Sequence, residues 1–212
     1  SAQGGSGGIF GSAALFAGFA TIEGAIRAVM NGDVNSSASV SVTSVGVNDA
    51  DAETLLISVG LFSAAGAATL ADIGLGADVE AVVGPTSSIT SSGAVIVSAI
   101  STNTADATSH VGSGGAIALS FAVPTARIEG GTRAQFGGDI LSTASLSVTA
   151  FGNYAATGSS IPVSVGLVSG TGAAVTAEIS GNAGVEAHIG PVVGLNSVAG
   201  GPNINVGGGD VD

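Results

Sequence analysis

Two long stretches of this sequence recur, without a gap, at a single offset of 106 residues. Residues 57–85 (ISVGLFSAAGAATLADIGLGADVEAVVGP) align with residues 163–191 (VSVGLVSGTGAAVTAEISGNAGVEAHIGP), and 16 of the 29 positions are identical. The same offset aligns residues 20–46 with residues 126–152, where 15 of 27 positions are identical. The chain therefore divides into a first repeat unit, residues 1–106, and a second, residues 107–212, which we expect to be truncated at its end.

Each unit also has a weaker internal two-fold similarity. The segment ATIEGAIRAVMNG resembles ADIGLGADVEAVVG, and SASVSVTSVGVND resembles SGAVIVSAISTNT. The spacing between such halves varies from 51 to 55 residues, which indicates turns that have gained or lost residues. The chain is thus predicted to hold four half-units of about 53 residues each.

Within a half-unit the hydrophobic period is two, as in β-strands. In the segment 116–123, large apolar side chains alternate with small ones, and we expect the larger set to fill a core while the smaller set meets water or another sheet. The larger set is Ile117, Leu119, Phe121 and Val123, and the smaller set is Ala116, Ala118, Ser120 and Ala122. Residues 145–149 alternate in the same way, with Leu146 and Val148 as the larger pair.

Turn residues separate these segments. The strings NGD at 31–33, GGD at 137–139 and GP at 84–85 and 190–191 combine Gly, Asn, Asp and Pro. Helical patterns are not convincing anywhere. Short strands spaced by about 8–12 residues predict an all-β fold, either a β-solenoid of stacked repeats or, as the alternative, a row of β-sandwich-like modules. The abundance of Gly, Ala and Ser favours thin layers whose backbones lie close together.

The composition excludes several classes of function. Three Arg, no Lys and fifteen acidic residues give a net charge of −12, which argues against binding nucleic acid or an anionic membrane surface. No Cys is present, so disulfides and thiolate metal sites are excluded. Residues 1–22 are uncharged, but six Gly among the first 18 residues favour a strand over a transmembrane helix, and we expect no membrane span.

Four charged residues occupy matching positions in successive half-units. Arg27 and Arg133 lie in the strings IEGAIRA and IEGGTRA, and the matching positions of the other half-units hold Glu80 and Glu186. If half-units stack in register, these four side chains form an alternating column of charge. Opposite charges on neighbouring strands contribute about 0.2–1 kcal/mol per pair. We expect this column to set the register between repeats; the alternative is four unrelated surface charges.

One acidic string is a candidate metal site. In NDADAE, alternation places Asp49, Asp51 and Glu53 on one face of a strand, where they could share a hard cation such as calcium. The duplicated segment carries no acids, so the site is not a property of the repeat. The alternative is a solvated acidic edge that deters pairing between sheet edges.

The sequence offers little for catalysis. His110 and His188 have no counterpart in the duplicate unit, and Ser109 beside His110 is adjacency rather than a triad. We therefore predict neither an enzyme nor a cofactor beyond the candidate calcium. A β-helix polysaccharide lyase is the nearest enzymatic alternative, but it requires a clustered base and acidic or metal groups.

The strings GAAVTAEISGNAGVEAHIG, ASLSVTAFGNYAATG and GAVIVSAISTNTADAT resemble the repeat regions of giant secreted bacterial adhesins, namely filamentous-haemagglutinin-like and leukotoxin-like exoproteins. The resemblance covers essentially the whole chain. It implies an extracellular or cell-surface location, a role as a stalk or fibre, and partners that are further copies of the repeat or neighbouring subunits. The alternative is a β-repeat module that binds glycans or another surface.

Overall fold

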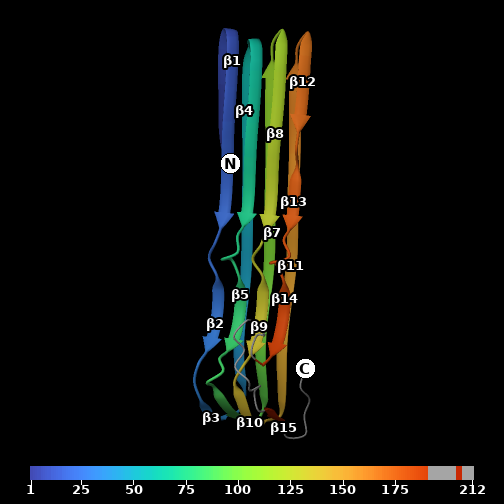
Figure 1. Cartoon of the computed structure of the whole chain (residues 1–212). Helices are drawn as coiled ribbons and strands as arrows, with labels where there is room; N and C mark the ends of the chain where they lie inside the picture. Colours follow the sequence, from blue (N-terminus) through green and yellow to red (C-terminus); the bar gives the residue numbers. More distant parts are fainter. Residues whose placement is uncertain (191–203, 207–212) are drawn as a thin grey trace.

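The computed structural model describes residues 1–190 and 204–206, and every regular element in this part of the chain is a β-strand (Figure 1). The all-β prediction is confirmed. The described residues contain no helix with the length and apolar character needed to cross a membrane. The strands are β1 (Ala2–Ile22), β2 (Ile26–Met30), β3 (Val34–Ser37), β4 (Val40–Ile73), β5 (Val79–Val83), β6 (Ser88–Ser91), β7 (Ala94–Gly114), β8 (Ile117–Ile128), β9 (Thr132–Phe136), β10 (Asp139–Thr143), β11 (Ser145–Val165), β12 (Val168–Ala173), β13 (Thr176–Ile179), β14 (Val185–Ile189) and β15 (Ile204–Val206).

The chain passes through the same path several times. A long leg leads to two short strands, a second long leg returns, and an arch joins that return leg to the outgoing leg of the next round. Strand β4 contains such an arch: its residues 40–59 pair with β7, and its residues 62–73 pair with β8. We call residues 11–22, 62–73, β8 and β12–β13 the outgoing legs, and residues 40–59, β7 and β11 the return legs.

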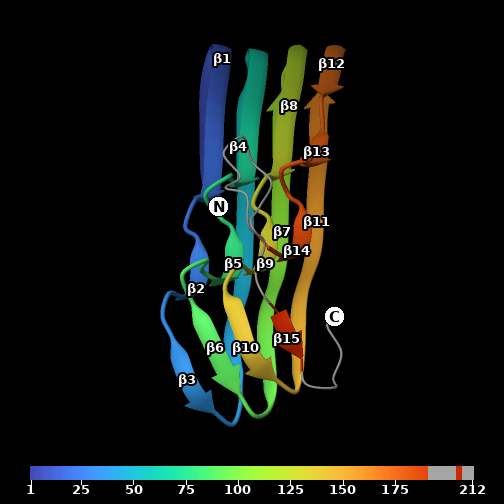
Figure 2. The same cartoon turned by 60° about the horizontal axis from the view of Figure 1, so that its bottom comes forward.

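Successive rounds pair in parallel at every ladder, so equivalent strands lie side by side (Figures 1 and 2). The legs form a seven-stranded sheet with the path β11-β7-β4-β8-β12, to which β1 and β13 attach. The short strands form two four-stranded sheets, β14-β9-β5-β2 and β15-β10-β6-β3. The boundary between the two sequence units, at residues 106 and 107, lies inside β7. The units are defined by sequence identity, and their boundaries therefore do not coincide with the arches.

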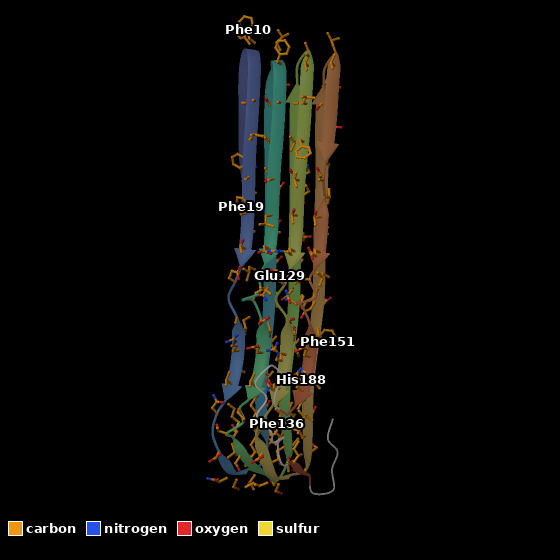
Figure 3. The ribbon with its side chains drawn as sticks, in the orientation of Figure 1. Phe10, Phe19, Glu129, Phe136, Phe151 and His188 are labelled. Atoms are coloured by element: carbon orange, nitrogen blue, oxygen red, sulfur yellow. The ribbon has the colours of Figure 1, made fainter. Side chains whose placement is uncertain are left out.

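The core changes in composition along the legs. At the end that carries the short strands, buried Val, Ile, Leu and Phe side chains pack together, and Phe136 is the largest of them (Figure 3). Between the legs the core is mostly alanine, with Ala50, Ala71, Ala105 and Ala126 almost fully buried. Nearer the arches, serine hydroxyls join the two legs. Beside these hydroxyls, Leu56 and Val111 of the return legs pack with Ala65, Ala67 and Ala122 of the outgoing legs.

Two expectations from the sequence are wrong. The strands are not all short, since β1 spans 21 residues and β4 spans 34. In the segment 116–123 the larger side chains face outward: Leu119 and Phe121 are each 53% exposed, whereas Ala118 and Ala122 are fully buried. The reason is that larger side chains of the return legs, such as Leu56 and Val111, occupy the space between the legs, so the outgoing legs turn their small side chains toward them. For Leu146 and Val148, at the end with the larger core, the expected inward orientation is confirmed.

Glycine at the arches permits neighbouring rounds to stack. A Cβ added to Gly60 would lie 2.8 Å from the carbonyl oxygen of Gly8 in the preceding round. A Cβ on Gly115 would collide with the carbonyl oxygen of Gly60, and one on Gly166 would lie 2.5 Å from that of Gly115. Real Cβ atoms do not approach backbone oxygen so closely, so each arch needs a residue without a side chain.

Candidate functional site

The four charged residues at matching repeat positions lie on adjacent strands of one short-strand sheet. Register partners are Arg27 and Glu80 on β2 and β5, Glu80 and Arg133 on β5 and β9, and Arg133 and Glu186 on β9 and β14. Arg27 Nε lies 2.7 Å from Glu80 Oε2, Arg133 Nη1 lies 3.2 Å from Glu80 Oε1, and Arg133 Nε lies 3.3 Å from Glu186 Oε2. We call these four residues the charge column.

Glu80 is the central and most enclosed member of the column. Its side chain is 11% exposed, compared with 56% for Arg27 and 40% for Arg133. Its Oε2 forms an ion pair with Arg27 of the preceding round and its Oε1 accepts from Arg133 of the following one, so one carboxylate joins three successive rounds. A slip by one residue would place Arg27 opposite Val79 or Ala81 and break the ion pair, whereas this register pairs every carboxylate with a guanidinium. The geometry is therefore specific for a single alignment of the rounds.

The carboxylate at the last position of the column has a second partner on its own strand. His188 Nε2 lies 3.2 Å from Glu186 Oε2, and Arg133 approaches the same oxygen from β9. The hydrogen bond with His188, together with the bond and charge of Arg133, lowers the pKa of Glu186 below its ordinary value. His188 thus supports the ion pair between Arg133 and Glu186.

A second charge row crosses the outgoing legs, and the sequence reasoning missed it. Asp72 on β4, Arg127 on β8 and Glu178 on β13 are successive register partners. Arg127 Nε donates to Asp72 Oδ1 at 2.9 Å, and this hydrogen bond is the main reason why the pKa of Arg127 is raised above its ordinary value. Asp72 and Arg127 are 55 residues apart, which is the offset between successive half-units. The repeat pattern therefore already contained the signal for this pair.

A pair of buried asparagine side chains also connects successive rounds. Asn48 Nδ2 donates to Asn103 Oδ1 at 3.0 Å and to the carbonyl of Ala77 at 3.3 Å. Asn103 Nδ2 in turn donates to the carbonyl of Gly130 at 3.2 Å. Both side chains are almost fully buried, so each amide satisfies turn carbonyls that would otherwise lack partners. These bonds also join successive rounds.

The candidate calcium residues lie on the return leg of β4. Asp49, Asp51 and Glu53 all point outward and are exposed, as alternation predicts. Their register partners on β7 are Thr104, Asp106 and Thr108. Within residues 1–190 and 204–206, no group of three or more His, Asp or Glu side chains is arranged to hold a metal ion. Alternate residues of an extended strand are about 6.6 Å apart, and this separation spreads the carboxylates along the leg.

A pocket with a volume of about 220 Å³ lies beside the charge column, and most of its polar side chains already have partners. Glu80, Arg133 and Glu186 are engaged with one another, and Asp78 Oδ1 accepts from the Gly131 amide at 2.7 Å. Elsewhere, Ser109 is fully buried while the next residue, His110, lies on the outer face of β7. Alternation therefore separates this serine from this histidine by the thickness of the strand.

Comparisons with known proteins give no relative for the chain: no family model matches it, and neither a curated protein nor a solved structure matches it significantly.

Proposed function

We propose that this chain is a β-solenoid segment that serves as a rigid spacer in an extracellular or cell-surface fibre or adhesin. Its work is mechanical: it supplies length, stiffness and a surface for self-association. The single observation that carries the proposal is the parallel, in-register stacking of successive rounds at every ladder. Because each round contacts only its neighbours, the architecture extends by addition of rounds.

The side-chain rows support the same conclusion. The charge column, the row of Asp72, Arg127 and Glu178, and the buried Asn48–Asn103 pair all tie one round to the next. The column begins with Arg27 and ends with Glu186, so a further round at either end would bring an opposite charge to it. Such a round could come from the same chain or from a second copy, in a head-to-tail contact that does not close.

The extracellular assignment rests on the sequence. The resemblance to repeats of giant secreted adhesins, the net charge of −12 and the small, Lys-free composition favour a solvated surface protein. The polar groups beside the column serve one another, and this favours a structural role over catalysis.

Lengthened versions of the chain test the proposal directly. Inserting one or two further copies of residues 61–166 at an arch adds two rounds per copy. Strands in a sheet are about 4.8 Å apart, so small-angle X-ray scattering should show that each copy extends the particle by about 10 Å along the stacking direction, while the length of the legs stays unchanged. A row of β-sandwich-like modules would instead gain about 30 Å per copy, since a domain of 100 residues has a radius of gyration of about 13 Å. That larger increment would refute the proposal.

A further inference from the structure

The outer face of the outgoing legs is apolar near the arches. Its large side chains point away from the fold and are substantially exposed, from 38% for Ile117 to 88% for Leu15. We call this surface the outgoing face; its large members are Leu15, Phe19, Phe62, Ile117, Leu119 and Phe121. A contiguous apolar surface of this kind is rare on a monomeric soluble protein and marks an interaction site.

Charge distinguishes the two outer faces of the legs. Residues 11–22, 62–71, 117–126 and 168–177 contain no Asp, Glu, Lys or Arg. The first charged row beyond them is that of Asp72, Arg127 and Glu178, in which the arginine lies between two carboxylates. Near the arches the return face is also uncharged and apolar, with Ile57, Val59 and Val163 exposed, but farther along the legs it carries Asp49, Asp51, Glu53 and Asp106. Two acidic return faces would repel each other, whereas two outgoing faces would not.

The outgoing face is not flat. Across the strands, one row of register partners reads Leu15, Gly66, Phe121 and Gly172, so large side chains alternate with glycine. A shallow groove there is lined by Leu15, Gly66, Ala68 and Phe121 among others. Leu15 lies over Gly66 within this row, because a Cβ on Gly66 would be 2.7 Å from Leu15 Cδ2. Side chains of a second, identical face could enter the groove and exclude water from the apolar side chains.

The size of the face suffices for a stable contact. Four legs at a spacing of about 4.8 Å and about ten residues of about 3.3 Å each cover roughly 19 by 33 Å. Two such faces would bury about 1,250 Å² in total, which lies within the range of stable protein interfaces, about 1,200–2,000 Å².

An apolar face could also be covered by lipid, but the unpaired backbone groups at the sheet edges argue against this. In the part of the chain that the structure describes, β1 pairs only with β4, and β12 only with β8, so both have an open edge. Immersion in lipid would remove those peptide groups from water without a partner, which is very costly. A second copy that covers the face leaves both edges in water.

We propose that two copies of this chain associate side by side through their outgoing faces, as a two-fold symmetric pair with the acidic return faces outward. The inference rests on the proposed function, because it names the surface through which the fibre segment self-associates laterally. A two-fold contact between identical faces ends at a dimer, whereas head-to-tail addition of rounds is open-ended. The two modes of association therefore give different assembly sizes and can be distinguished.

Sedimentation velocity of the whole chain over a wide concentration range tests the proposal. The test variant is Leu119→Asp, and the matched control is Val163→Asp on the return face, since the two residues are 53% and 50% exposed. The chain should form a concentration-dependent dimer. Leu119→Asp should weaken the dimer at least about 100-fold, because it brings unpaired carboxylates into the contact. Val163→Asp should leave the dimer constant within about threefold.

Three results would overturn the inference. The first is a chain that stays monomeric throughout, the second is open-ended growth without a dimer, and the third is equal weakening by both variants. Flotation with phosphatidylcholine vesicles, lost in Leu119→Asp, would assign the face to lipid instead. Circular dichroism melts of both variants establish that they are folded; should Leu119→Asp not fold, Leu119→Ser replaces it. The rod proposal is judged separately, by the length added per inserted copy.

Discussion

Arg27 lies directly opposite Glu80 on a neighbouring parallel strand, with Nε 2.7 Å from Oε2, although residues 27 and 80 are one full round of chain apart. The same carboxylate accepts from Arg133 of the following round at 3.2 Å. A contact of this kind forms only when three rounds have reached the same register. The column therefore reports on the stacking that the proposed function requires.

Replacing Glu80 by Gln should destabilise the chain by about 1–2 kcal/mol, because an ion pair with Arg27 and a charge-assisted hydrogen bond from Arg133 are weakened while both arginines can still reach water. Urea unfolding monitored by circular dichroism measures the change. Asp49→Asn is the matched control, since it removes the same charge from an exposed position on the return face. That variant should stay within about 0.5 kcal/mol of the parent. Equal effects of the two substitutions would show that the column does not contribute.

The stability of the chain should include a small acid-sensitive contribution from Glu186. Its pKa is lowered from the ordinary value of 4.5 by His188 and Arg133, so folding favours the ionised carboxylate. The contribution is present above the unfolded value of 4.5 and is lost as pH falls through the lower folded value. The side chain is 46% exposed, so the effect should stay below about 1 kcal/mol.

An NMR titration of Glu186 checks this directly. In the His188→Ala variant the pKa of Glu186 should move back toward 4.5, because the largest cause of its shift is gone. An unchanged titration of Glu186 without His188 would contradict the assigned cause.

Gly115→Ala should destabilise the chain by about 1–3 kcal/mol, because the new methyl group collides with the carbonyl oxygen of Gly60 in the preceding round. Gly114→Ala provides a closely matched control: a Cβ there meets nothing within 4 Å. It should be neutral or stabilise the fold by up to about 1 kcal/mol through the unfolded state. Thermal melts compare the two. A neutral Gly115→Ala would mean that the arches do not stack as closely as described.

Close packing between the legs predicts that the same substitution will change stability differently at two adjacent positions. Ala67 is 4% exposed and faces the other leg, whereas Ala68 points outward. Ala67→Leu should cost about 1–3 kcal/mol or more through overpacking, and Ala68→Leu should change stability by less than about 0.5 kcal/mol. Chemical unfolding measures both. The reverse order would indicate that the inward and outward faces have been interchanged.

Much of this arrangement could be predicted from periodicity. Alternation with a period of two indicates strands, and the offset between half-units equals the length of a round, so the matching positions of Arg27 and Glu80 become register partners. The same spacing could have identified Asp72 and Arg127, which the comparison of half-units did not use. Repeats convert sequence offset into spatial contact, and this is why the charged rows are accessible without coordinates.

Other features depend on three-dimensional spacing that alternation does not contain. A period of two separates Leu119 from Ala118 but does not say which of them faces inward. That choice follows from what the return legs place opposite, because Leu56 and Val111 fill the space between the legs and leave room for small side chains on the outgoing legs. For the same reason the acids Asp49 and Asp51 share a face, as alternation predicts, yet do not converge, because an extended leg separates them.

The in-register stacking of rounds is tested most directly by engineered disulfides, since the chain has no native cysteine. Thr43 and Ser98 are register partners on the outer faces of β4 and β7, and partners in a parallel ladder lie about 4.8 Å apart, within reach of a disulfide. Thr43→Cys with Ser98→Cys should therefore oxidise within one chain, as seen by mass spectrometry of non-reduced peptides. Thr43→Cys with Ile100→Cys, at about 8 Å, should not. Efficient crosslinking of the second pair, or of neither, would contradict the stacking of the rounds.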